Sequence, residues 1–151
     1  MVGSFDFSSS YPAVMVAFKY PMSKGEYIGK ITREQLMELC KRYCCMFRIK
    51  ATNVISTSNF YEHPLSASKC RGEDGKLLRR GVVKDNGRVI SAEYLETTMT
   101  EQDFFTYERF YSQETLELFD CYIYEINALL KRYKHLSALA AKEPQPAIQT
   151  A

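Results

Sequence analysis

The chain has 151 residues, enough for one domain with a substantial hydrophobic core. Hydrophobic residues make up 46% of it and charged residues 25%, which are globular values and exclude a disordered or fibrous chain. The net charge is only +2, so the overall composition gives no sign of nucleic-acid binding.

The charge is distributed unevenly along the chain. Residues 19–50 carry eight Lys or Arg and three Glu, and residues 69–88 carry seven Lys or Arg and three acids. Residues 93–125 carry nine acids and a single Arg. This asymmetry allows a basic face toward nucleic acid, although a dipolar, solvated surface explains it at least as well.

The cysteines are odd in number and include no C-x-x-C pair, and the chain has only two histidines. This pattern argues against a zinc site and against a disulfide framework. We expect small buried side chains in a reducing cytoplasm. No signal peptide and no run of roughly 18 apolar residues is found in the sequence, so we expect no membrane partner. The cysteines are Cys40, Cys44, Cys45, Cys70 and Cys121.

The first half of the chain predicts two strands and two helices separated by a loop. Thr32 and Gln35 form a capping-box pattern at the start of the second helix. Arg48 and Lys50 alternate with apolar residues, which predicts a half-buried strand with a basic outer side. In chain order we expect a strand at 3–8, a helix at 10–18, a loop at 20–31, a helix at 33–43 and a strand at 45–51.

The second half begins with turn-rich sequence and then predicts a hairpin. Asn86-Gly87 between two valine-rich runs is a strong signal for a tight hairpin turn. We expect Phe104, Tyr107 and Tyr111, which share one side of a helix, to lie in the core rather than to stack on bases. The predicted elements are a short strand at 65–70, a strand at 88–97, a helix at 101–111, a strand at 115–124 and a basic helix after it.

Strands mixed with helices in this order predict an α+β fold with a mainly antiparallel sheet and three to four helices. We expect one folded region at 1–142 and a disordered, Pro-containing tail at 143–151.

The stretch from Ser4 to Met15 predicts a strand, a turn and the start of a helix. Asp6 ends the predicted strand, and Tyr11-Pro12 opens the predicted helix. A carboxylate beside the N–H groups of a helix N-terminus suits a divalent cation and a phosphate. Taken alone, an Asp at this position is far more often an ordinary helix cap than a metal ligand.

The spacing Asp-x-x-Ser-x-Tyr-Pro resembles motif A of family B DNA polymerases. Segments 64–70, 85–92, 97–104 and 110–112 are similar to the region that follows motif A in phage and prophage enzymes. The protein-primed branch, which has an insertion after motif A, is the most similar. The resemblance covers roughly residues 3–125 and implies that 1–142 is a partial polymerase palm.

The resemblance also implies roles for the motif residues. Asp6 would be a catalytic carboxylate that binds Mg²⁺ in a two-metal site. Tyr11 would exclude the 2′-hydroxyl of a ribonucleotide, and Ser10 departs from the leucine usual before it. The residues implied to approach the incoming nucleotide are Phe7, Ser8, Ser9, Ser10 and Tyr11.

The function implied is that of a DNA-directed DNA polymerase fragment acting in phage or prophage DNA replication. Its partners would be a DNA template-primer, deoxynucleoside triphosphates and, as a further candidate, a priming protein. The sequence contains neither Asp-x-Asp nor Asn-Ser-x-Tyr-Gly, so we expect this chain by itself to be inactive. Lys69, Arg71 and Arg88 in the second basic segment are weak candidates for DNA contacts. The alternatives are a non-catalytic nucleic-acid- or protein-binding module, with Asp6 as a cap, and a degenerate prophage remnant.

Overall fold

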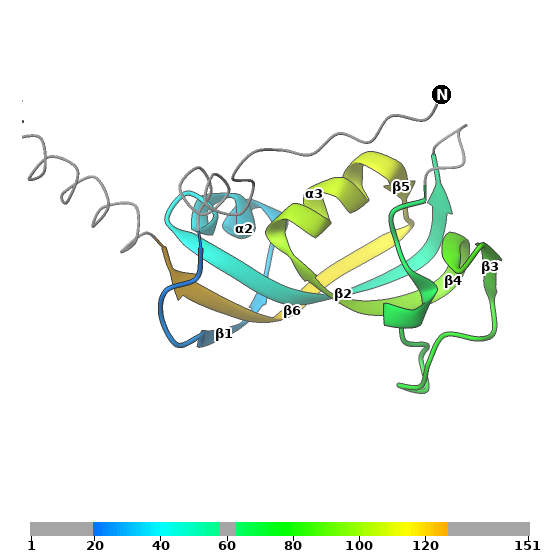
Figure 1. Ribbon diagram of the computed structural model, residues 1–151, viewed down its shortest axis with the longest axis horizontal. Coiled ribbons are helices and arrows are strands. Elements are labelled where there is room, and N and C mark those ends of the chain that lie inside the picture. The colour runs from blue at the N-terminus through cyan, green and yellow to red at the C-terminus, as the bar shows by residue number, and fades with distance from the viewer. Residues whose placement is uncertain (1–19, 58–62, 127–151) are drawn as a thin grey trace, which may run out of the picture.

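The computed structural model describes residues 20–57 and 63–126, which form one long antiparallel sheet with two α-helices (Figure 1). The first part holds three elements, β1 (Glu26–Ile31), α2 (Arg33–Leu39) and β2 (Tyr43–Ser56). The second part holds a 3₁₀ turn (Ala67–Lys69), β3 (Val82–Asp85), β4 (Arg88–Thr100), α3 (Glu101–Phe110), β5 (Tyr111–Ser112) and β6 (Thr115–Glu125).

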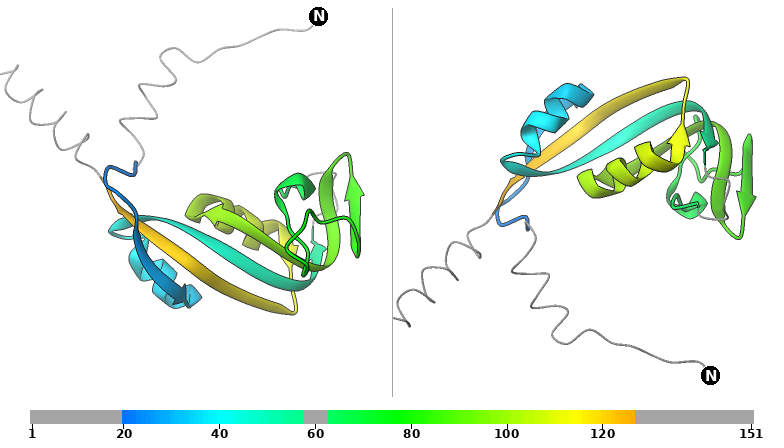
Figure 2. Two further views of the ribbon diagram at one scale, coloured as in Figure 1. Left: turned by 90° about the horizontal axis from the view of Figure 1, so that it is seen from below. Right: turned by 90° about the horizontal axis from the view of Figure 1, so that it is seen from above.

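The strand order in the sheet is β1-β6-β2-β4-β3, and every pairing between these strands is antiparallel. The central strand β2 pairs with β4 along one edge and with β6 along the other, so that Ile49 lies opposite both Thr97 and Leu118. The short β5 pairs with the end of β2. The long strands twist strongly (Figure 2), as expected for strands of this length.

Both helices cover the same face of the sheet (Figure 1). Leu36 of α2 and Phe104 of α3 are fully buried in the core below them. The rings of Phe104 and Phe47 meet edge to face at 5.4 Å. Arg33 of α2 and Glu108 of α3 form an ion pair, with Nη2 donating to Oε2 at 3.1 Å, and this pair joins the two helices above the sheet.

The opposite face of the sheet is not covered by any helix of the described residues. We call it the open face. Along β2, Cys45, Phe47, Ile49 and Ala51 are buried, whereas Met46 and Lys50, which alternate with them, are exposed, so burial follows the two-residue period of a strand. The basic outer side predicted for this strand is therefore confirmed.

The expected partial palm with three to four helices is wrong. Of the described residues 54% lie in strands and 20% in helical turns, with two α-helices. Extended segments of 14 residues in β2 and 13 in β4 dominate the sheet. The further helices predicted at 10–18 and after 124 fall outside the described residues, as do the strand at 3–8 and the tail at 143–151.

Three local predictions were also wrong. The expected loop at 20–31 contains β1, where Gly29 at a φ of +81° coincides with a register shift against β6. Such an irregularity hides the strand pattern, because it breaks the two-residue period. The helix expected at 33–43 ends at Leu39, and the strand expected at 65–70 is the 3₁₀ turn.

Other local predictions were confirmed. Asn86 and Gly87 both have positive φ, at 47° and 76°, as a type I′ hairpin turn requires. Phe104, Tyr107 and Tyr111 are buried.

Among the described residues the longest helix is α3, with ten residues. No helix in this part of the chain is long and apolar enough to cross a membrane.

Candidate nucleic-acid interface

The residues of the motif that resembles the polymerases lie outside the described part of the chain. These are the metal and catalytic candidate Asp6 and the nucleotide-binding candidates Phe7, Ser8, Ser9, Ser10 and Tyr11. Their predicted roles, and the Mg²⁺ predicted on Asp6, therefore stay predictions.

Two of the three predicted DNA-contacting residues come together on the described sheet. Lys69 and Arg71 line a hollow of about 380 Å³ together with Arg48 of β2. The rest of its lining is Glu96, Thr97 and Thr98 of β4. We call this site the basic hollow, because three cationic side chains and one carboxylate line it.

Backbone pairing holds the basic hollow in place. Arg71 and Glu96 exchange two backbone hydrogen bonds, with N···O distances of 2.7 and 2.9 Å. The backbone carbonyl of Lys69 accepts a hydrogen bond from Oγ1 of Thr97 at 3.2 Å. On the other edge of β4, Arg48 lies opposite Thr98 in the β2–β4 register. Lys69 at the end of the 3₁₀ turn and Arg71 just after it therefore lie beside the same part of β4 as Arg48 of β2.

The Glu96 carboxylate is hydrogen-bonded to side chains around the hollow, so its negative charge is directed to them rather than to an anion in the hollow. One carboxylate oxygen, Oε2, accepts from Arg48 at 2.8 Å, and the other, Oε1, accepts from the hydroxyl of Tyr94 at 2.5 Å. Both oxygens therefore have a partner already. Burial, together with this hydrogen bond to Glu96, raises the pKa of Tyr94 to about 12. Tyr94 is consequently a neutral donor at physiological pH.

Arg48 is held in position by two acids and one ring. Besides Glu96 it pairs with Asp120, with Nη1 to Oδ2 at 3.5 Å, and its guanidinium lies 5.2 Å from the ring centre of Phe119. Its charge is partly balanced by these acids. Lys69 and Arg71 are exposed and supply the net positive charge of the hollow.

Aromatic side chains continue across the open face beside the basic hollow. Tyr27 of β1 and Tyr122 of β6 contact each other with ring centres 5.2 Å apart, and their exposed fractions are 57% and 40%. The ammonium group of Lys50 lies 5.6 Å from the ring centre of Tyr94. Exposed rings next to cations are the pattern by which proteins stack nucleobases while they bind the phosphate backbone.

The third predicted DNA-contacting residue, Arg88, does not line the basic hollow. Its Nη1 donates to the carbonyl of Pro64 at 3.0 Å, and the residue lines a neighbouring cavity of about 110 Å³. Lys69 lines both spaces, so Arg88 extends the basic surface past the 3₁₀ turn rather than adding to the hollow itself.

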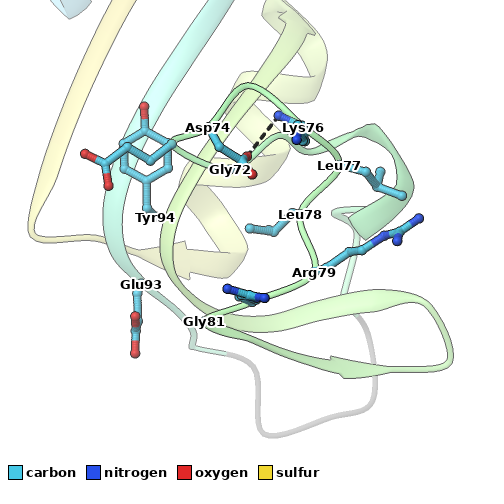
Figure 3. Close-up of a pocket in the computed structure, with 11 residues that line it drawn as sticks. Gly72, Asp74, Lys76, Leu77, Leu78, Arg79, Gly81, Glu93 and Tyr94 are labelled. Atoms are coloured by element: carbon cyan, nitrogen blue, oxygen red, sulfur yellow. Dashed lines mark hydrogen bonds between the residues drawn. The ribbon is translucent and has the colours of Figure 1, made fainter.

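A larger cavity of about 660 Å³ lies between β4 and the loop 72–81 (Figure 3). Glu93 and Tyr94 come from β4, and the other lining residues come from the loop. Three cations and three carboxylates line it, namely Lys76, Arg79, Arg80, Glu73, Asp74 and Glu93. Because these charges balance, it is a weaker candidate for an anion than the basic hollow.

One cluster bears on the inference that the cysteines form no zinc site. Cys40, Cys45 and Glu101 offer ligand atoms that lie within 4.8 Å of one another, although the cysteine count and spacing argued against a metal site. The carboxylate comes from α3, 56 residues after Cys45, and a search for close Cys or His pairs cannot find it. The two cysteines that flank a short helix-to-strand turn were the signal available in the sequence.

Comparison of the chain with models of protein families, with curated proteins and with solved structures finds no match. The resemblance to family B polymerases therefore rests on the motif residues themselves.

Proposed function

We propose that the described region binds the backbone of single-stranded nucleic acid on the open face of its sheet. Phosphates lie against Lys69 and Arg71 in the basic hollow, and bases stack on the exposed rings of Tyr27 and Tyr122. The observation that carries this proposal is the meeting of the two basic segments of the sequence at β4, through Arg48 and through Lys69 with Arg71.

Several features support phosphate binding over a merely solvated surface. Arg48 is positioned by Glu96 and Phe119, so less side-chain entropy is lost when it contacts a ligand. Lys69 and Arg71 are anchored through their backbones, while their side chains remain exposed. The acids Glu96 and Asp120 already have cationic or hydroxyl partners on the protein.

The test is a double charge reversal, Lys69→Glu with Arg71→Glu, in the 151-residue chain. Binding of a fluorescent single-stranded DNA is followed by anisotropy over a series of salt concentrations. The plot of log affinity against log salt has a negative slope, and each lost phosphate contact makes it shallower by about 0.7 for single strands. We therefore expect the slope to become shallower by about 1.4 and the affinity to fall at every salt concentration.

The matched control is Lys41→Glu with Arg42→Glu, which makes the same change in net charge at the end of α2. Both control residues are exposed and lie away from the basic hollow. If the two double variants lose the same affinity, binding depends on net charge and the site at β4 is wrong. If the wild-type chain binds no DNA at low salt, the proposal as a whole is wrong.

A second proposal is that the chain is a fragment of a DNA-directed DNA polymerase, to which the open face would contribute a template-primer contact. The specific observation in its favour is the run Asp6 to Pro12, with its resemblance to motif A. In this proposal Asp6 binds Mg²⁺, and Phe7 to Tyr11 contact the deoxynucleoside triphosphate. Since the sequence holds no Asp-x-Asp, we expect nucleotide binding without sustained primer extension.

Asp6→Ala tests this second proposal. We expect Mg²⁺-dependent binding of a fluorescent deoxynucleoside triphosphate to be lost in this variant and kept in the control Asp85→Ala, at the exposed hairpin. Tyr11→Val should raise the affinity for ribonucleotides relative to deoxyribonucleotides without changing the Mg²⁺ dependence. Equal nucleotide binding by the Asp6→Ala and wild-type chains would show that Asp6 binds no metal ion and would favour its role as a helix cap.

A further inference from the structure

Three groups that bind metals in other proteins meet at one corner of the helix-covered face. Cys40 is the C-cap of α2, Cys45 lies near the start of β2, and Glu101 is the first residue of α3. The two thiol sulfurs and a carboxylate oxygen all lie within 4.8 Å of one another. The cluster thus joins three elements from two distant parts of the chain.

The strand register explains why these groups meet. The β2–β4 ladder ends at the pair Met46 and Thr100, so the next residues along each chain are Cys45 and Glu101. There the Glu101 side chain replaces the missing strand partner, and the N–H of Cys45 donates to its Oε2 at 3.3 Å. The turn after α2 then brings Cys40 back over Cys45.

The cluster is shielded from solvent. Cys45 is 3% exposed and Glu101 is 5% exposed, whereas Cys40 is half-buried. The Glu101 carboxylate already accepts a hydrogen bond from the N–H of Cys45, and a bound cation would in addition balance its charge. Half-exposed Cys40 leaves a route by which an ion can enter.

A third thiol lies beside the cluster. Cys121 of β6 is fully buried and shares a hydrogen bond with the thiol of Cys45. This bond, with burial and the nearby charge of Glu101, raises the pKa of Cys45. The same bond lowers the pKa of Cys121, although burial and the neighbouring Cys40 act in the opposite direction. The groups whose ligand atoms lie within 4.8 Å of one another do not include Cys121, so it is a neighbour of the cluster rather than a member of it.

We propose that Cys40, Cys45 and Glu101 bind a thiophilic divalent cation of the Zn²⁺ class. Sulfur ligands with one carboxylate suit tetrahedral Zn²⁺ and do not suit Mg²⁺, which takes oxygen ligands. Zn–S bonds of about 2.3 Å place tetrahedral sulfurs about 3.8 Å apart. The ligand atoms, now within 4.8 Å, need to close by only about 1 Å.

The ion would stabilise the fold rather than act on a substrate. It would tie the end of α2 and the start of α3 to the start of β2, at a place where Cys45 and Glu101 are shielded from solvent. The site lies on the face of β2 opposite to the basic hollow, so this proposal stands independently of nucleic-acid binding.

The test uses the full chain, purified under reducing conditions and freed of metal with a chelator. Zn²⁺ is titrated in competition with a chromophoric chelator, and Co²⁺ serves as a spectroscopic probe. We expect one equivalent of Zn²⁺ to bind and to raise the melting temperature. Co²⁺ should give the visible bands of a tetrahedral ion and sulfur-to-metal charge-transfer bands. No binding, or a Co²⁺ spectrum of oxygen ligands only, would overturn the proposal.

Variants identify the ligands. Cys40→Ser, Cys45→Ser and Glu101→Gln should each weaken Zn²⁺ affinity by about 100-fold or more, since loss of even an outer-shell partner costs roughly 10- to 100-fold. Cys121→Ser should leave the charge-transfer intensity close to that of the wild-type chain, and a clear loss of intensity would contradict a ligand set limited to Cys40, Cys45 and Glu101. Circular dichroism of each metal-free variant separates lost binding from lost folding.

The matched control is Cys44→Ser. Cys44 is the neighbour of Cys45 on the same strand, so its side chain points to the other face. We expect its Zn²⁺ affinity and Co²⁺ spectrum to equal those of the wild-type chain. Equal losses in Cys44→Ser and Cys45→Ser would mean that thiols bind the metal nonspecifically.

Discussion

The helix-covered face and the open face of this sheet are made by the same strands, yet they carry different chemistry. On β2 the covered face presents Cys45, Phe47 and Ile49 to a closed core, whereas the open face presents Arg48 and Lys50 beside aromatic rings. Apolar burial on the first face supplies most of the stability. Charges on the second face contribute little to folding, because exposed ion pairs are weak. Residues that bind a ligand are therefore best sought on the open face, where the side chains contribute little to folding stability.

The sharpest test of this difference compares two phenylalanines on opposite faces. Phe47 is fully buried against Phe104, and Phe47→Ala should lower the free energy of unfolding by about 3–5 kcal/mol. Phe119 is half-buried under Arg48, so Phe119→Ala should lower the free energy of unfolding by only about 1 kcal/mol or less. Urea denaturation of both variants measures the two values. Equal losses would mean that the open face is covered in solution.

The same contrast shows what the sequence could predict. Two-residue alternation at 45–51 identified which side of β2 is buried, and Asn86-Gly87 identified the hairpin, because both signals are local. Phe104 and Tyr107 share one side of α3, and their burial followed from that spacing; Tyr111 is buried as well, but as part of β5.

The candidate sites depend on contacts that are distant in sequence and were less predictable. Lys69 and Arg71 were candidates from local charge, but their meeting with Arg48 depends on the backbone pairing of Arg71 with Glu96. The cluster at Cys45 depends on the point where the β2–β4 ladder ends. No local pattern encodes either pairing.

A second test concerns the junction of β4 and α3. Thr100 is the N-cap of α3 and forms a reciprocal capping box with Asp103. Thr100→Ala should therefore cost about 1 kcal/mol of unfolding free energy. Thr98, two residues earlier and exposed in β4, is the matched control, and Thr98→Ala should cost about 0.5 kcal/mol or less. Thermal or urea unfolding measures both, and a larger loss at Thr98 would contradict the assignment of the cap.

A third test addresses the hydrogen bond between Tyr94 and Glu96 on the open face. Burial is the larger cause of the raised pKa of Tyr94, about 12, and the Glu96 carboxylate is the next. Glu96→Gln should therefore lower this pKa but leave it above the ordinary value of 10. The measurement is the ultraviolet tyrosinate titration, taken as the difference between each chain and its Tyr94→Phe counterpart.

The same raised pKa fixes the sign of a stability change with pH. Below pH 10 Tyr94 keeps its proton in both the folded and the unfolded chain. Between pH 10 and about 12 the unfolded chain loses this proton first, so the contribution of Tyr94 to stability falls as the pH rises. The Tyr94→Phe chain should lack this component of the alkaline destabilisation. An identical pH dependence in both chains would contradict the hydrogen bond.

The smallest expected effect separates folding from binding on the open face. Asp120 accepts a hydrogen bond from Tyr27 and pairs with Arg48 at 3.5 Å, and its φ of +47° is one that Asn also tolerates. Asp120→Asn should therefore change the free energy of unfolding by about 0.5 kcal/mol or less, as expected for an exposed ion pair.

The same substitution removes a negative charge beside Arg48, so that cation attracts a phosphate more strongly. The affinity for single-stranded DNA should rise on the order of twofold to threefold at low salt and converge with that of the wild-type chain at high salt. Anisotropy titrations at two salt concentrations measure this change. Weaker binding by Asp120→Asn at low salt would show that Asp120 positions Arg48 for its ligand rather than competing with that ligand.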